Sequence, residues 1–301
     1  ENQSTLGLTH SILDVTGIDH DGDGIVSRIY AGDLGGNMFA FKDDEMQDFT
    51  PCSDTVSAMV VDGSWDARKL FNASSDGNQR KIMYAPDAVE EHFGEIIYFG
   101  TGDRTDPLET DIVNRFYAVK NDWAGTTVDM TESDLVDVTD DEIQLGTSAQ
   151  QAAVLASLEA AKGWYIRLEN PGEKVVASPR VYGGVVYFTT YTPPATAGGD
   201  PDDPCAVSTV RGVARLYAVN YKTGGSIHNF SDIVETDGDN EVVDLGKHDR
   251  VVELGTAIPS APVIAILEGG ARLFVGVEGG IASLPAIETQ DIHRYFWHQP
   301  F

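Results

Sequence analysis

Short runs that alternate between apolar and polar residues recur along most of the chain, separated by turns rich in Gly, Asp and Pro. Alternation over about four to eight residues is typical of β-strands with one buried face. The pattern predicts strands over residues 28–33, 38–41, 64–71, 81–86, 94–102, 114–119, 164–168, 180–182, 185–191, 215–219, 273–276 and 281–284. The predicted fold class is therefore all-β.

One arrangement repeats within these runs: a strand, a loop of variable length, and a second strand that carries an aromatic-Ala pattern. It occurs in residues 29–41, 98–119 and 186–219, and more weakly in residues 273–284. Repeated units of this kind are how the blades of a β-propeller appear in a sequence. About four blades are the lower limit of such rings. We therefore expect a modified β-propeller with about four blades in residues 1–301, and we favour a part of a larger ring over a small complete one.

Residues 127–163 interrupt the strand rhythm. Ala152, Leu155, Ala156 and Glu159 follow helical spacing, with Thr and Ser before them and Gly163 after them. Such start and stop signals predict one α-helix. We expect a helical insertion within the propeller, with this Ala and Leu face packed on a blade.

An acidic loop precedes the first repeat. Asp19, Asp21 and Asp23 stand at alternate positions, Gly24 follows them, and the backbone carbonyl of Ile25 comes next. A tightly wound loop turns such carboxylates towards one centre, and Ca²⁺ prefers several oxygen ligands at about 2.3 to 2.6 Å. The sequence predicts a calcium site here, with an ordinary solvated Asp-Gly turn as the alternative.

The loop departs from an EF-hand at two positions. Ser27 stands where such loops usually place another acid, and Tyr30 replaces the Glu that closes an EF-hand. Leu34-Gly35-Gly36-Asn37 then separates two short apolar runs, which predicts a β-hairpin. A metal loop that leads into a hairpin is consistent with a propeller blade. The acidic stretch 237–244 lacks the corresponding glycine and is predicted to be a hairpin turn.

The charge of the chain excludes several classes of partner. There are 20 Lys and Arg against 48 Asp and Glu, which gives a formal net charge of −28. So acidic a surface repels nucleic-acid phosphates and anionic lipid headgroups, and no apolar run reaches the roughly 18 residues that a membrane span needs. We expect neither nucleic-acid binding nor a membrane span. The chain begins with Glu1 and shows no signal peptide, which indicates a processed or trimmed sequence.

Candidate chemistry other than calcium is sparse. Cys52 and Cys205 lie outside any Cys-x-x-Cys context, so zinc clusters and covalent haem are not indicated, and their pairing stays open. We find no Gly-x-Ser-x-Gly elbow, Walker loop, Rossmann fingerprint or zinc-protease helix. The sequence therefore favours a non-enzymatic protein.

Several stretches, in the same order along the chain, resemble the C-terminal β-propeller of the PilY-type and PilC-type adhesins found at the tip of type IV pili. They comprise the acidic loop running into residues 28–37, then residues 99–104, 163–166, 176–179, 203–205, 254–262 and 292–297. The collinear order over most of the chain is more specific than any one motif.

The resemblance implies an extracellular pilus-tip protein, exported through the periplasm, in which calcium adjusts pilus extension against retraction and surface attachment. It assigns the calcium ligands to Asp19, Asp21, Asp23, the carbonyl of Ile25 and Ser27. Ser27 departs from the family's usual Asp and implies a weaker site. Asp14 is an alternative first ligand, because some members begin the loop there.

The same resemblance implies partners: the N-terminal remainder of the same protein, which would complete the ring, together with minor pilins at the pilus tip and a surface or host ligand. Two other classes stay open. The stretch Tyr30 to Asn37 is also similar to a quinoprotein blade, which implies a propeller dehydrogenase, although a complete ring and vicinal cysteines are missing. A purely structural subunit of an extracellular filament is the third class.

Overall fold

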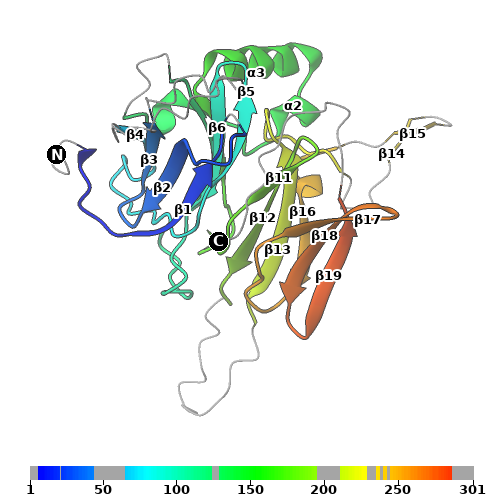
Figure 1. Cartoon of the computed structure of the whole chain (residues 1–301). Helices are drawn as coiled ribbons and strands as arrows, with labels where there is room; N and C mark the ends of the chain where they lie inside the picture. The colour runs from blue at the N-terminus through cyan, green and yellow to red at the C-terminus, as the bar shows by residue number, and fades with distance from the viewer. Residues whose placement is uncertain are drawn as a thin grey trace.

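Mainly antiparallel sheets stand side by side in the computed structural model, and the pair β8–β9 is parallel (Figure 1). The structure describes residues 6–20, 22–43, 65–123, 129–194, 211–228, 235–237, 240–242 and 245–286. The first sheet has the strand order β1-β2-β3-β4. Its strands are β1 (Ile12–Ile18), β2 (Arg28–Asp33), β3 (Asn37–Asp43) and β4 (Trp65–Asn72). Each strand is antiparallel to the next, so the chain forms this sheet as a meander.

The second and third sheets have five strands each. The second, ordered β5-β6-β7-β9-β8, contains β5 (Asp87–Glu91), β6 (Gly94–Gly100), β7 (Arg115–Asn121), β8 (Val136–Asp137) and β9 (Gly163–Arg167). In the third, β10-β12-β13-β16 are neighbours and β11 also pairs with β12. Its strands are β10 (Lys174–Val175), β11 (Arg180–Tyr182), β12 (Val185–Thr192), β13 (Val213–Asn220) and β16 (Val251–Gly255).

The fourth sheet has three strands, β17 (Val263–Leu267), β18 (Gly270–Val277) and β19 (Gly280–Pro285). A separate hairpin pairs β14 (Glu235–Asp237) with β15 (Asn240–Val242), as predicted for the second acidic stretch. The helices are η1 (Glu132–Asp134), α2 (Glu142–Leu145), α3 (Ser148–Ala160) and η2 (Lys247–Arg250).

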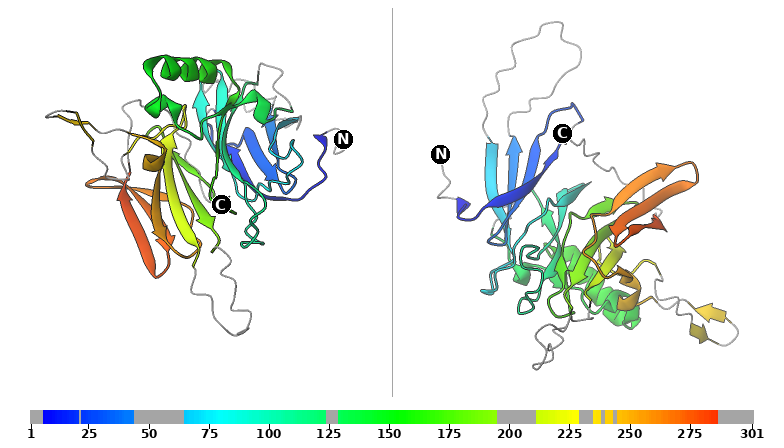
Figure 2. Two further views of the ribbon diagram at one scale, coloured as in Figure 1. Left: turned by 180° about the vertical axis from the view of Figure 1, so that it is seen from behind. Right: turned by 90° about the horizontal axis from the view of Figure 1, so that it is seen from below.

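Each large sheet is built around one hairpin of the predicted repeat. These hairpins are β2–β3, β6–β7, β12–β13 and β18–β19, and all four are antiparallel. The alternation therefore identified one hairpin in every large sheet. Four sheets that follow one another along the chain, each packed on the next (Figure 2), have the arrangement of propeller blades.

Aromatic side chains fill the spaces between neighbouring sheets. Phe116 of the second sheet stacks on Phe188 of the third with ring centroids 3.8 Å apart, and Phe188 stacks on Tyr217 at 4.6 Å. Phe71 of the first sheet meets Tyr117 of the second at 5.0 Å. A smaller cluster around Leu273 and Val275 joins the fourth sheet to the third. The core is thus divided into three apolar layers, one at each junction between sheets.

The strand predicted over residues 81–86 is wrong. This segment is a connector between the first two sheets: the Ile82 N–H donates to the Asp33 carbonyl at 3.1 Å, and the Lys81 carbonyl accepts the Gly102 N–H at 3.0 Å. Its backbone is satisfied by two different neighbours, so it forms no ladder with either. The strand of this region, β5, begins after Pro86.

The predicted helix is present as α3, but the prediction of its packed face is wrong. Ala152, Leu155, Ala156 and Glu159 are exposed, and Leu158 is the buried residue of the helix. The helix lies across the ends of the strands (Figure 1), so only a narrow stripe near its C-terminal end reaches the sheet below. No helix in the described ranges is long and hydrophobic enough to cross a bilayer.

The helical elements are an excursion within the second sheet. Between β7 and β9 the chain forms η1, β8, α2 and α3, and it then returns so that Gly163 pairs with Val119. The insertion limits of 127 and 163 and the extent of the domain stay predictions.

Candidate metal centre

The acidic loop connects β1 to β2 at one end of the first sheet. The last paired residues of the two strands are Ile18 and Arg28, so residues 19–27 form the whole connection. The Ser27 N–H donates to the Ile18 carbonyl at 2.9 Å and closes the base of the loop. The loop is therefore held by a regular hairpin rather than by two helices, as it would be in an EF-hand.

The loop winds around the carboxylate of Asp19. One oxygen of Asp19 accepts the N–H groups of Gly22 and Asp23 at 2.8 and 3.1 Å, and the other accepts the Gly24 N–H at 2.8 Å. Gly22 and Gly24 have φ of 80° and 92°, a region that L side chains rarely adopt. The two glycines permit the tight winding that directs these N–H groups inward.

The other predicted ligands follow in the same loop. The Asp23 carboxylate accepts the Ile25 N–H at 2.7 Å, and both residues are exposed. The Ser27 side chain is buried, and its hydroxyl oxygen accepts the His20 N–H at 3.2 Å. Asp21 lies outside the described residues. Within them, no group of three acidic, His or Cys side chains is gathered closely enough to hold a metal ion.

The donor set of the loop suits a hard cation. Its candidate ligands are carboxylate, carbonyl and hydroxyl oxygens, which Ca²⁺ prefers, and the loop lacks the sulfur that softer metals select. Asp19 and Asp23 already orient the backbone, and each carboxylate oxygen has further lone pairs that a cation could use. The described residues therefore fit a calcium ion in chemistry.

The position of Asp14 favours Asp19 as the first ligand. Asp14 lies within β1, and its carboxylate accepts the N–H groups of Val15 and Ala85 at 3.0 and 3.2 Å. Ala85 belongs to the connector that leads to the second sheet. The Asp14 side chain is thus directed to that connector.

A buried carboxylate that the sequence analysis missed, Glu95 of β6, lies behind the loop. Its side chain accepts the Trp123 indole N–H at 2.8 Å and lies 3.5 Å from the Arg28 guanidinium and 4.0 Å from the His20 ring. Burial raises the pKa of Glu95 above its ordinary value. The available signal was an acid at the start of an apolar strand, which indicates a paired charge.

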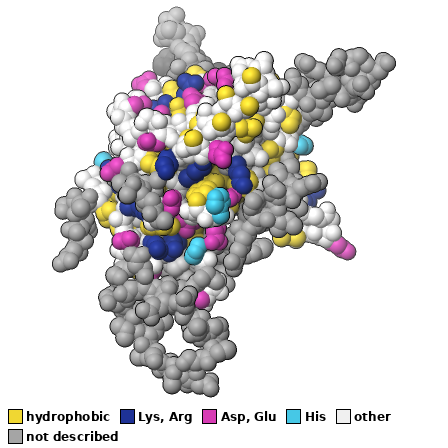
Figure 3. Space-filling view, turned by 90° about the horizontal axis from the view of Figure 1, so that it is seen from above, with side chains coloured by type: hydrophobic (Ala, Val, Ile, Leu, Met, Phe, Trp, Pro, Cys, Tyr) yellow, Lys and Arg dark blue, Asp and Glu magenta, His cyan; other side chains and the backbone are white. Residues whose placement is uncertain are grey.

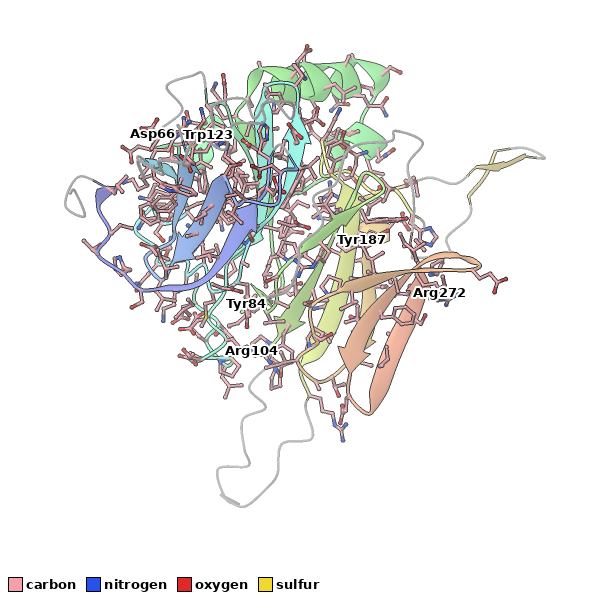
Figure 4. All side chains as sticks on the ribbon, in the orientation of Figure 1. Asp66, Tyr84, Arg104, Trp123, Tyr187 and Arg272 are labelled. Atoms are coloured by element: carbon pink, nitrogen blue, oxygen red, sulfur yellow. The ribbon has the colours of Figure 1, made fainter. Side chains whose placement is uncertain are left out.

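Trp123 joins the first two sheets above this carboxylate. The Arg68 guanidinium of β4 lies 4.0 Å from the centre of the Trp123 ring, and the Asn121 amide donates to the buried Tyr30 hydroxyl at 2.8 Å. Figure 4 labels Trp123 and Asp66 towards the same end of the first sheet. Because His20 and Arg28 also touch Glu95, the loop is connected to the second sheet and not only to its own hairpin.

Comparison with known proteins identifies similar chains, although no family model matches. A "Type IV pilus biogenesis factor PilY1 homolog" from Xylella fastidiosa is 26% identical over 289 residues, which cover 92% of this chain and 21% of the relative. The "Type IV pilus biogenesis factor PilY1" of Pseudomonas aeruginosa strain UCBPP-PA14 is 25% identical over 272 residues, covering 75% of this chain and 22% of the relative.

The fold gives the same result. The crystal structure of the Pseudomonas aeruginosa PilY1 C-terminal domain matches 92% of this chain with a TM-score of 0.59 at 18% identity. The predicted resemblance to the PilY-type family is confirmed. The chain spans about a fifth of the length of these PilY1 relatives and 61% of the PilY1 C-terminal domain structure. Cys52, Cys205 and the terminal stretch 292–297 lie outside the described residues.

Proposed function

We propose that this chain is the calcium-binding, C-terminal propeller region of a type IV pilus-tip adhesin and biogenesis factor. The observation that carries the proposal is the agreement in both sequence and fold with PilY1 over 92% of the chain. The activity is binding and assembly rather than catalysis. Its place is extracellular, at the pilus tip, after export through the periplasm.

Calcium binds, in this proposal, to the carboxylates of Asp19, Asp21 and Asp23, the carbonyl of Ile25 and the hydroxyl of Ser27. The winding of the loop around Asp19 supports this ligand assignment. The backbone N–H groups of Gly22 and Gly24 donate to the Asp19 carboxylate and hold it in place before a cation arrives. Ser27 brings no charge to the site, so we expect weaker binding than with an acid there.

Occupancy of the loop acts on the pilus through the junction of the first two sheets. His20 lies between two of the ligands, and its ring is 3.4 Å from Glu90 of β5 and 4.0 Å from Glu95 of β6. A cation that fixes the loop also fixes these contacts. This connection supports a role for calcium in the balance of pilus extension and retraction.

The partners in this proposal are the N-terminal remainder of the same protein, minor pilins at the pilus tip, and a surface or host ligand. The relatives are about five times longer than the matched region, which leaves room for the remainder.

A calorimetric calcium titration tests the metal site. We expect about one equivalent of Ca²⁺ to bind to the unaltered chain, and Asp19→Ala, Asp21→Ala and Asp23→Ala each to abolish binding. Asp14→Ala is the matched control and should leave binding intact, because the Asp14 carboxylate is directed to Ala85. Binding that survives in all four variants would show that the loop is an ordinary turn.

The role in the pilus needs a test in cells. A strain that carries Asp23→Ala in its full-length protein should show altered surface piliation and attachment compared with a strain that carries Asp14→Ala. Equal piliation in the two strains, with calcium binding lost in one of them, would contradict calcium control while leaving the metal site in place.

A further inference from the structure

Arg28, the first residue of β2, contacts the acidic loop and the second sheet at the same time. Its guanidinium donates to the Ser27 carbonyl at 3.0 Å, and its Nε atom lies 3.5 Å from the Glu95 carboxylate of β6. Arg28 is 8% exposed and Glu95 is fully buried. The guanidinium therefore links the last predicted ligand of the loop to the neighbouring sheet, away from bulk water.

Every polar group of the Ser27 backbone is hydrogen-bonded. Its N–H donates to the Ile18 carbonyl at 2.9 Å, and its carbonyl accepts the Asp43 N–H at 3.0 Å as well as the Arg28 guanidinium. The Ser27 hydroxyl oxygen accepts the His20 N–H at 3.2 Å. The direction of this hydroxyl thus depends on a backbone that Arg28 helps to fix.

Glu95 is itself held firmly within the second sheet. Its carboxylate accepts the Trp123 indole N–H at 2.8 Å, and Glu95 stands opposite Asn121 in the ladder between β6 and β7. The Asn121 amide in turn donates to the Tyr30 hydroxyl of β2 at 2.8 Å. Because a buried carboxylate is tolerated only with such partners, it is a fixed anchor for the guanidinium and not a mobile surface charge.

Groups that lie behind metal ligands fix their orientation, and loss of such a group typically lowers metal affinity about 10- to 100-fold. A ligand that is already in place also loses less conformational freedom when the cation binds. We propose that Arg28 and Glu95 are positioning residues of the calcium loop: Glu95 holds the Arg28 guanidinium, which holds the Ser27 backbone in place for the cation.

This inference rests on the proposed calcium site and adds that a residue of the second sheet sets part of its affinity. Coupling between two equilibria is reciprocal. If the contact between Glu95 and Arg28 strengthens calcium binding, bound calcium strengthens that contact by the same factor. Calcium would then tighten the junction between the first two sheets.

Position and charge make opposite predictions for Arg28. A guanidinium near the loop repels a cation, so loss of its charge alone would tighten calcium binding in Arg28→Met. If Arg28 positions the loop, the same change weakens binding. We expect a loss of about three- to tenfold, less than is usual for such groups, because the Asp43 N–H still holds the Ser27 carbonyl.

Arg68→Met is the matched control. The guanidinium groups of Arg68 and Arg28 lie 4.0 and 5.4 Å from the centre of the same Trp123 ring, but Arg68 donates to the Asp122 carbonyl at 3.3 Å. Figure 3 shows this end of the molecule from above, with Lys and Arg side chains close to Asp, Glu and His side chains. Arg68→Met removes one charge from this mixed surface, and it should leave calcium affinity unchanged or slightly higher.

A double substitution tests whether Glu95 acts through Arg28. Arg28→Met alone leaves a buried carboxylate without its guanidinium, whereas Arg28→Met with Glu95→Gln removes both charges and leaves none unpaired. The double variant should bind calcium as weakly as Arg28→Met, within about twofold, because the two residues form one unit. If Arg28→Met fails to fold, the double variant is compared with Arg68→Met instead.

The measurements are calorimetric calcium titration and amide hydrogen exchange of the calcium-free proteins. We expect the N–H groups of Ser27 and Asp43 to exchange faster in Arg28→Met and in Glu95→Gln than in the unaltered chain. Arg68→Met should leave their exchange unchanged. Exchange reports the order of the loop before any cation binds, so it is independent of the titration.

Two results would overturn this inference and leave the calcium site in place. One is calcium binding by Arg28→Met, or by the double variant if Arg28→Met fails to fold, that is as tight as binding by Arg68→Met. The other is a double variant whose loss of affinity equals the product of the two single losses. Absence of calcium binding by the unaltered chain would instead overturn the calcium site itself.

Discussion

Gly36, in the turn between β2 and β3, is a single residue on which the first sheet depends. Its φ is 85°, its carbonyl accepts the Ala73 N–H at 2.8 Å, and an added Cβ would lie 2.6 Å from the Arg80 carbonyl oxygen. The neighbouring Asp33 is buried and accepts the N–H groups of Gly35 and Asn37 at 2.9 and 2.8 Å. The turn is therefore fixed both by its backbone conformation and by its surroundings.

We predict that Gly36→Ala lowers the free energy of unfolding by about 2 to 4 kcal/mol, because left-handed strain adds to a clash with backbone. Gly77→Ala is the control, since Gly77 has a similar φ of 89° but open space around its Cα. It should cost only the conformational part, about 1 to 2 kcal/mol. Urea unfolding of both variants measures the difference, and equal losses would show that the surroundings of Gly36 do not matter.

The buried Glu95 is a second single residue with a measurable effect, because it makes the stability of the fold depend on pH. Its pKa is raised, mainly by burial, so the folded state binds this proton more tightly than the unfolded chain does. The stability associated with the proton is present below the ordinary Glu value of 4.5 and is lost as pH rises through the raised pKa. Tyr30, Arg28 and His20 face the carboxylate, and each acts to lower its pKa and so partly offsets the effect of burial.

Glu95→Gln should therefore flatten the fall in stability with pH in the range just above 4.5. The measurement is the difference between the melting temperatures of the two proteins over that range, because other titrating groups cancel in the difference. A constant difference at all pH values would show that Glu95 has the same pKa in the folded and unfolded chain.

At the scale of elements, Leu158 is the buried side chain that anchors α3, and Val154 packs partly buried beside it. Leu158 is 6% exposed and packs into the layer between the second and third sheets, whereas Leu155, one turn earlier, is 48% exposed. Leu158→Ala should lower the free energy of unfolding by about 2 to 3 kcal/mol, and Leu155→Ala by less than about 0.5 kcal/mol. Thermal unfolding followed by circular dichroism measures both losses. A larger loss from Leu155→Ala than from Leu158→Ala would instead support the packed face predicted from the sequence.

The elements also show how far the sequence could lead. Aromatic alternation identified one hairpin in each of the four sheets, because most of these strands bury side chains at a junction between sheets. It missed β1, β5 and β17, the first strands of three sheets, and also the edge strands β8, β10 and β16. β5 reads Asp-Ala-Val-Glu-Glu and β17 is a continuous apolar run, so neither alternates. Their pairing is decided by the neighbouring strand.

The candidate site was predictable in part for a similar reason. The spacing of Asp19, Asp21 and Asp23 is local, so one stretch of sequence was enough to propose it. The contacts of Arg28 and His20 with Glu95 bring together residues more than 60 positions apart. The spacing of residues along the chain does not indicate this contact, because it depends on how the first two sheets pack.

At the scale of the whole molecule, the first and fourth sheets expose apolar side chains, whereas such side chains are buried at the junctions between neighbouring sheets. Leu13 and Val15 of β1 are 53% and 52% exposed, and Val263 and Ile281 of the fourth sheet are 59% and 71% exposed. Exposed apolar patches mark interaction sites when they are contiguous. The N-terminal remainder of the protein, in our proposal, covers them and completes the ring.

Ile281→Glu should leave the unfolding free energy of this chain within about 0.5 kcal/mol of the original and reduce its self-association. In a longer chain that includes the preceding residues, the same change should be destabilising, because it would bury a charge at a junction. Val275→Glu, at a buried position of the same sheet, is the control that should unfold both proteins. Sedimentation and urea unfolding measure the two effects, and an Ile281→Glu variant neutral in both chains would contradict ring closure at this face.

The helical segment between β7 and β9 bears on which parts of the chain can change in length. The chain leaves the second sheet after β7 and re-enters it at β9, and these two strands are direct neighbours, with Val119 opposite Gly163. Both ends of the excursion are thus fixed by one ladder of hydrogen bonds, whatever lies between them. We therefore expect a change of length between residues 142 and 160 to leave the register of the blade unaltered, provided that Leu158 stays in the apolar layer.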